Sequence, residues 1–105
     1  MAAIPLDSVV AMSAALRAGT LRSVDIVSAF LARIRAQDAW FHAFVEVYEE
    51  EAMALAEAAD TSMRAGAWLG PLHGIPVAIK DLIDIEGRVT TLGRVRVVAT
   101  HDVDW

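Results

Sequence analysis

Apolar residues recur at spacings of three and four positions near the start of the chain, which is typical of a helix with one buried face. Asp7 or Ser8 can cap the first turn of such a helix, and Gly19 suits the left-handed residue just past its end. The spacing therefore predicts a first helix between these residues. Its buried stripe is predicted to be Val9, Met12 and Leu16.

Two further helices are predicted downstream. Ser23 offers a cap for the second, Asp25 lies in the first turn where the helix dipole favours a carboxylate, and the end is expected between Gln37 and Ala39. The third is predicted over residues 49–64, because glutamates open the segment and alanines fill it. The buried face of the second helix is predicted to be Ile26, Val27, Phe30, Leu31 and Ile34.

Residues 40–48 have a different pattern, with aromatic and β-branched residues at alternate positions. This pattern favours a short strand or an extended connector. Trp40 and Phe41 are interpreted as core residues rather than as a platform for stacking.

A second strand is predicted at Ile75–Ile79, a continuous apolar run that follows a loop rich in glycine and proline. Such a run fits a strand buried on both faces by helices. Pro76 must then lie near the start or edge of the strand, because it cannot donate to a ladder. The order of helices followed by buried strands predicts an incomplete α/β layer.

Lys80 follows this run directly and precedes Leu82 and Ile83, so its stem is expected to be partly removed from water. Burial disfavours the charged ammonium and lowers the pKa of a lysine. Bringing that pKa from about 10.4 to about 7–8 requires roughly 4 kcal/mol, and a lysine so tuned can act as a general base. The alternative is a surface lysine paired with Asp81 or Asp84.

Composition and charge exclude several classes of function. The chain is 56% hydrophobic and 22% charged, which argues for a folded domain, and its net charge of −5 disfavours nucleic-acid and anionic membrane partners. It has no cysteine, no evident signal peptide and no apolar run near the ~18 residues of a membrane helix. We expect a cytoplasmic protein, with no cofactor and no metal. The apolar excess also favours self-association through exposed apolar surface.

The segment around Lys80 resembles the amidase signature family. The run from Gly70 to Asp84, GPLHGIPVAIKDLID, matches the family's loop, strand and catalytic lysine, and Thr90-Thr91-Leu92-Gly93 matches the turn that follows. The resemblance implies an α/β fold, in which N-terminal helices precede the first strands of an amidase-type mixed sheet covered by helices, here truncated. It covers roughly residues 6–93.

The resemblance also implies hydrolysis of a small-molecule carboxylic amide by a Ser–cis-Ser–Lys triad. In the family, a neutral lysine takes a proton from a bridging serine, which activates the nucleophilic serine for attack on the amide carbonyl. Lys80 matches the lysine and is the one catalytic residue assigned. Neither serine has a match, since both lie well downstream of the lysine in the family, and the chain alone is expected to be inactive.

The likeness ends after Gly93, where Arg94 stands in place of the family's usual serine. We therefore interpret residues 1–93 as the N-terminal portion of an amidase domain. Residues 94–105 are interpreted as a divergent tail, such as a shift of reading frame would produce.

Three other features have simpler interpretations than catalysis or binding. His73, in the glycine-flanked loop, is expected to have a turn role or to bond to backbone, and a metal site at residues 101–104 is less favoured than a solvated tail. The basic residues Arg88, Arg94 and Arg96 form too weak a patch for nucleic-acid recognition.

Two hypotheses for function follow. The first is an amidase-family protein whose catalytic contribution is Lys80. The second is a non-catalytic truncated fragment, or a helical module that binds a protein partner.

Overall fold

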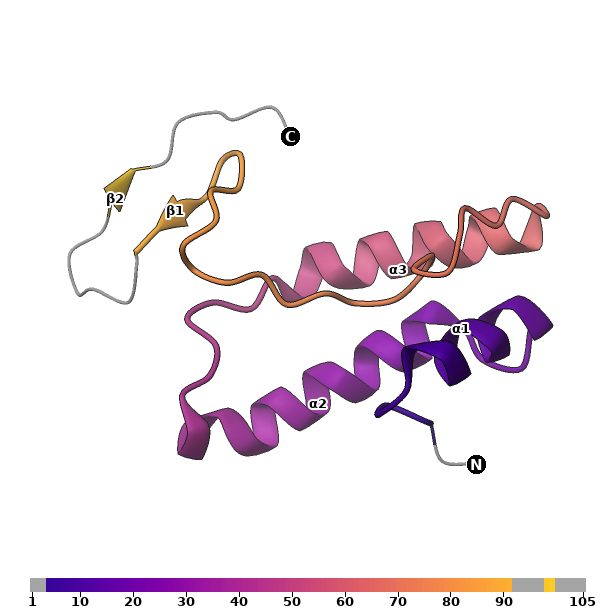
Figure 1. Ribbon diagram of the computed structural model, residues 1–105, viewed down its shortest axis with the longest axis horizontal. Helices are drawn as coiled ribbons and strands as arrows, with labels where there is room; N and C mark the ends of the chain where they lie inside the picture. Colours follow the sequence, from indigo (N-terminus) through magenta and orange to yellow (C-terminus); the bar gives the residue numbers. More distant parts are fainter. Residues whose placement is uncertain (1–3, 92–97, 100–105) are drawn as a thin grey trace.

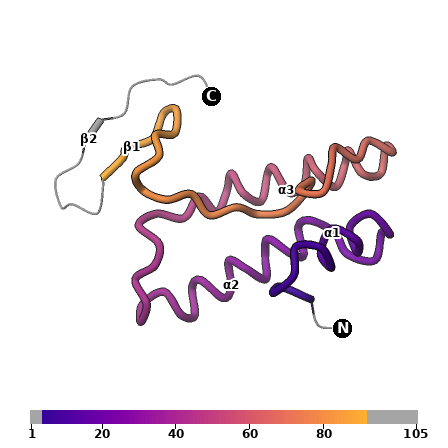
Figure 2. The backbone as a smooth tube through the Cα atoms, in the orientation of Figure 1, coloured from indigo at the N-terminus to yellow at the C-terminus, as the bar shows by residue number. Residues whose placement is uncertain are grey.

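The computed structural model describes residues 4–91 and 98–99, in the order α1 (Val9–Ala18), α2 (Ser23–Phe41), α3 (Glu49–Arg64), β1 (Val89–Thr90) and β2 (Val98–Ala99). The helices α2 and α3 pack along each other, and α1 lies beside the start of α2 (Figure 1). The chain then returns from the end of α3 past the helices toward β1 (Figure 2). No helix formed by the described residues is long and apolar enough to cross a membrane.

Both ends of α1 follow the sequence pattern. The Ser8 side chain accepts a hydrogen bond from the Ala11 N–H at 3.1 Å, and Gly19 closes the helix at φ 77°. The predicted caps are confirmed. Met12 and Leu16 are buried as predicted, whereas Val9 is 46% exposed, so its predicted place in the core is wrong.

The start of α2 differs from the prediction by one residue. Arg22 is the N-cap, and Asp25 accepts a hydrogen bond from the Arg22 N–H at 3.3 Å. Ser23 is the first helical residue rather than the cap, and its N–H donates at 2.6 Å to the Asp60 carboxylate on α3. The acceptor for this helix end therefore comes from 37 positions away, where no local pattern could indicate it.

The other end of α2 also runs further than predicted, to Phe41, where His42 follows in the left-handed region at φ 48°. Trp40 and Phe41 are 85% and 74% exposed, so their assignment to the core is wrong. They lie on the last turn of α2, beyond the part of the helix that packs on the others. Residues 42–48 form the extended connector that was the alternative to a strand.

The core consists of two small clusters along the seam between the helices. The first joins α1 to α2, and the second joins α2 to α3; their buried members are Met12, Leu16 and Ile26 in one and Val27, Leu31 and Ala56 in the other. Ile26, at 0% exposure, is the most completely buried apolar side chain among the described residues. The predicted helix bounds of α3, 49–64, are confirmed.

The strand predicted at Ile75–Ile79 is not formed. Ile75 packs on the first cluster, but Val77 and Ile79 are 72% and 53% exposed. A strand needs a neighbour to bond with, and the backbone of residues 76–79 makes no hydrogen bond with any described residue. The described residues thus form a mostly helical structure in which only the antiparallel pairs Val89 with Ala99 and Thr90 with Val98 have strand geometry. The expected mixed sheet is absent from them.

Candidate functional site

Lys80 lies at the end of the extended segment and is exposed to solvent. Its predicted partial burial is therefore not observed among the described residues. Its carbonyl oxygen accepts a hydrogen bond from the Ile83 N–H at 3.0 Å, which starts a turn. Lys80 is also the single lysine of the chain.

The loop before Lys80 is held by His73. Its Nδ1 accepts a hydrogen bond from the Leu69 N–H at 3.3 Å, so the proton of a neutral ring lies on Nε2. That nitrogen lies 2.9 Å from the Ala59 carbonyl oxygen on α3, to which it then donates. The imidazole thus links the loop to the helix, which confirms the predicted bond to backbone.

A second anchor joins the same loop to the start of α2. The Ser23 hydroxyl donates to the Gly74 carbonyl at 2.6 Å, and Gly74 has φ 78°. A Cβ atom at position 74 would lie 3.2 Å from the Ser23 Cβ and 3.3 Å from a methyl carbon of Leu16. Glycine adopts this left-handed conformation without steric cost, and a Cβ here would require the Ser23 and Leu16 side chains to shift, so the loop is seated closely on the helices.

After Lys80 the chain is tied by two carboxylate–threonine pairs. The Asp81 carboxylate accepts from the Thr91 N–H at 3.1 Å and from the Thr91 hydroxyl through its other oxygen. Asp84 accepts from the hydroxyl of Thr90 at 2.7 Å, and Thr90 is buried. The resemblance points to the two threonines without a role for them, and the spacing of Asp81 and Thr91 gives no local signal of their contact.

Arg88 connects this second loop to α3. Its guanidinium pairs with Glu51 and lies 4.0 Å from the centre of the Tyr48 ring. Arg88 is therefore charge-compensated rather than part of a basic patch. Arg94 and Arg96, the other members of that patch, lie outside the described residues.

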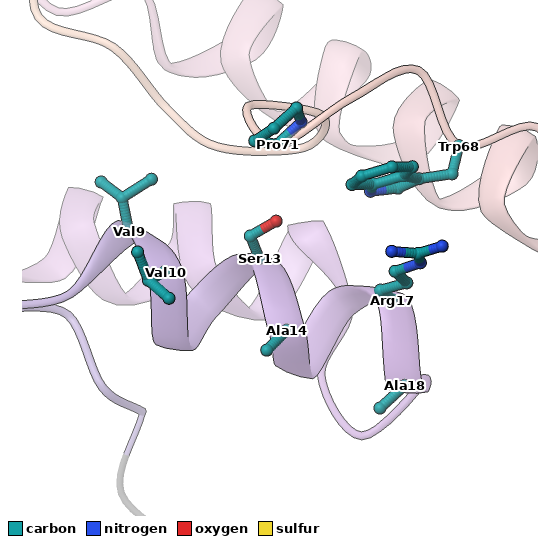
Figure 3. Close-up of a pocket in the computed structure, with 8 residues that line it drawn as sticks. All are labelled: Val9, Val10, Ser13, Ala14, Arg17, Ala18, Trp68 and Pro71. Carbon is teal, nitrogen blue, oxygen red and sulfur yellow. The ribbon is translucent and has the colours of Figure 1, made fainter.

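A shallow apolar groove of about 540 Å³ lies elsewhere, between α1 and the loop at Trp68 and Pro71 (Figure 3). The Arg17 guanidinium stacks on the Trp68 ring at 4.3 Å, and the buried indole N–H of Trp68 has no acceptor among the described residues. One lining residue, Pro71, belongs to the run from Gly70 to Asp84, but Lys80 itself does not line the groove. The groove is therefore separate from the candidate catalytic lysine.

The structure assigns no second catalytic group beside Lys80 among the described residues. Ser8 caps α1 and Ser23 bonds to the loop, so both hydroxyls have structural partners. Within the described part of the chain, no group of three or more histidines and carboxylates could hold a metal ion. Residues 101–104, weighed as a metal site from the sequence, lie outside that part.

Comparison with known proteins places this segment in a family. The family model described as Amidase matches residues 25–101, which include the loop anchored by His73, Lys80 and both carboxylate–threonine pairs. No solved structure gives a significant match.

The chain is similar to curated proteins of two kinds. It is 45% identical over 86 residues to a glutamyl-tRNA(Gln) amidotransferase subunit of Chloroflexus aurantiacus, a match that covers 82% of this chain and 18% of that one. It is 45% identical over 76 residues to an amidase of Pseudomonas putida, covering 72% of this chain and 16% of the relative. The chain thus spans less than a fifth of the length of these relatives. On the family match, which covers most of its residues, the chain belongs to the amidase family.

Proposed function

We propose that this chain supplies the lysine of an amide-hydrolysing site, with Lys80 as the general base. The observation that supports the proposal is the family match, which spans Lys80 and the loops on either side of it. The partner groups would be the two serines of the Ser–cis-Ser–Lys triad that the resemblance implies.

The proposed reaction is acyl transfer through a serine. Neutral Lys80 would accept the proton of the bridging serine, which in turn would take the proton of the nucleophilic serine as it attacks the amide carbonyl. The C–N bond then breaks, the amine leaves with a proton, and water hydrolyses the acyl-enzyme. The substrate class is a carboxylic amide, either a small aliphatic or aryl amide or, as the name of the amidotransferase relatives suggests, a glutaminyl amide.

The proposal includes a change in the surroundings of Lys80. A lysine with an ordinary pKa near 10.4 is almost wholly charged at neutral pH and is a poor base. Lys80 is exposed here, so the polypeptide that completes an amidase domain would have to bury it. The same polypeptide would pair with Ile75–Ile79 and complete the mixed sheet that the resemblance implies.

The test is complementation. The chain is co-expressed with the part of the Chloroflexus aurantiacus amidotransferase protein that follows the matched region, and release of ammonia from benzamide and from glutamine is measured. We expect no release by the chain alone and release by the complex. Lys80→Ala and Lys80→Arg should each reduce it to background, since loss of a triad member typically removes a factor of about a million.

Arg33→Ala is the matched control, since Arg33 is an exposed cation on α2. Its activity should equal that of the unchanged complex. Hydrolysis that persists in the Lys80→Ala complex would contradict the role of Lys80.

A second candidate is a non-catalytic helical module that binds a protein through exposed apolar surface. It is favoured by the exposure of Trp40, Leu69 and Val77, at 85%, 81% and 72%. A contiguous patch of such side chains would form an interaction surface, including one for a second copy of the chain. Sedimentation over a range of concentrations tests this: self-association supports it, and a monomer at all concentrations contradicts self-association.

A further inference from the structure

Lys80 lies between two anchored points of the backbone. On its N-terminal side, Gly74 and Ile75 are fixed to the helices through Ser23 and the first apolar cluster. From residue 76 to residue 79 the backbone bonds to no described residue. The position of Lys80 therefore depends on what holds the chain immediately after it.

The contact between Asp81 and Thr91 lies on that side. The two oxygens of the Asp81 carboxylate accept separately from the backbone N–H and the hydroxyl of Thr91. Hydrogen bonds to a charged acceptor are about twice as strong as neutral ones, and two of them to one residue also fix its orientation. The contact closes a loop of which Lys80 is the immediate neighbour.

A second pair adds another tie within the closed loop. The Asp84 carboxylate accepts a hydrogen bond from the Thr90 hydroxyl at 2.7 Å, and Thr90 is buried, at 6% exposure. Arg88 then fixes the loop to α3 through Glu51 and Tyr48. The loop from Asp81 to Thr91 is thus a small closed unit fastened to the helical body.

We propose that Asp81 and Thr91 are positioning residues that fix the backbone of Lys80 for its role as general base, an inference that rests on the function proposed above. General-base catalysis requires the accepting atom within hydrogen-bond reach of the proton donor, and a misplacement of about 1 Å can cost a factor of about 100 in rate. The carboxylate–threonine contact supplies this constraint at the residue directly after Lys80.

The single lysine of the chain permits a direct test. Chain grown with 15N-lysine gives one backbone amide signal, that of Lys80, whose order parameter is measured by NMR relaxation. We expect a value near 0.85, typical of rigid backbone, in the unchanged chain and below about 0.6 in Thr91→Val. Thr91→Ser keeps the hydroxyl and should restore the rigid value.

Thr61→Val is the matched control, because Thr61 is an exposed threonine on α3 whose hydroxyl donates to the Glu57 carbonyl. It should leave the Lys80 signal unchanged. A purely structural role of Thr91 would lower helix content without a hydroxyl-specific effect at Lys80, so circular dichroism is recorded for every variant. If Thr91→Val loses its helices, the order parameter of the Lys80 amide is measured in Asp81→Asn instead, and a fall below about 0.6 is again the expected result.

An order parameter that is unchanged in Thr91→Val, or that falls equally in Thr61→Val, overturns the proposal. The measurement needs no hydrolysis, so its outcome is independent of the complementation assay. In an active complex, Thr91→Val should lower kcat by roughly tenfold with KM unchanged, the pattern of a lost transition-state constraint. A raised KM with unchanged kcat would contradict it.

Discussion

The helices and the segment that follows them satisfy their backbone hydrogen bonds in different ways. In α1, α2 and α3 the bonds are made within each helix, and side chains such as Ser8 and Asp60 serve the helix ends. From residue 76 to residue 79 the N–H and C=O groups meet no described residue. A helix is complete by itself, whereas an extended segment depends on a neighbour that another part of the polypeptide must supply.

The apolar side chains of the two regions also differ in how far they are buried. Ile26 and Val27, within α2, are buried by α1 and α3. Val77 and Ile79 belong to an equally apolar stretch but remain mostly exposed. Apolar character alone therefore does not predict burial in this chain; a packing partner is also needed.

The largest expected effect tests this contrast directly. Ile26→Ala removes a fully buried side chain and should lower the free energy of unfolding by about 3 kcal/mol, through lost burial and the cavity left behind. Val77→Ala should change it by less than about 0.5 kcal/mol, because the side chain is already in water. Urea unfolding followed by far-UV circular dichroism measures both. Equal losses would show that the extended segment is packed in solution.

The next effect concerns the long-range cap. Asp60→Ala leaves the N–H groups of Ser23 and Val24 without their acceptor in a buried site, and should cost about 2 kcal/mol. Glu57→Ala, at an exposed position on the same helix, is the control and should be near neutral. Amide hydrogen exchange locates the loss of stability in Asp60→Ala. Faster exchange in α3 alone, with exchange in α2 unchanged, would contradict the role of Asp60 as a cap.

A smaller effect is expected where the loop meets α3. His73→Ala removes the link between the Leu69 N–H and the Ala59 carbonyl and should cost about 1 kcal/mol. His42→Asn is the comparison, since His42 is exposed and asparagine tolerates its left-handed backbone. Thermal unfolding should separate the two variants. If His42→Asn unfolds at a lower temperature than His73→Ala, the stabilising role of the His73 link is contradicted.

The smallest effect lies at the exposed start of α2. The side-chain hydrogen bond from Arg22 lowers the pKa of Asp25 below its ordinary value of 3.8. A lowered folded-state pKa means that the carboxylate stabilises the fold fully above the unfolded-state pKa, and that this contribution is lost as the pH falls through the folded-state pKa. Asp25→Asn should therefore be slightly less stable than the unchanged chain at neutral pH and equal to it in strong acid. A stability difference between the two chains that grows toward low pH would contradict a lowered pKa of Asp25.

Local signals predict the helices well. Ser8, Gly19 and the glutamates that open α3 act within one turn of their own positions, so the sequence contains the whole of their effect. The start of α2 lies one residue from its predicted place because its acceptor, Asp60, comes from another helix. Trp40 and Phe41 have the residue types of a core, but the described residues leave both side chains mostly exposed on the last turn of α2, so the prediction of their burial is wrong.

The candidate site is predictable only in part. The run of residues around Lys80 predicts its catalytic role, which stays a prediction, whereas the predicted backbone bond of His73 is confirmed. The strand before Lys80 and the burial of its side chain are not observed, because no described residue pairs with residues 76–79. The contact of Asp81 with Thr91 spans a loop, and loop closure leaves no periodic pattern in a sequence.

The single lysine also makes the chain sensitive to one kind of cleavage. Endopeptidases bind their substrates as exposed, extended backbone, which residues 76–79 already provide. An enzyme that cuts after lysine has Lys80 as its only site. Limited digestion would then sever the chain at the border between its helical body and the loop from Asp81 to Thr91. The residue proposed for catalysis is thus also the point at which the two regions can be separated by a single cut.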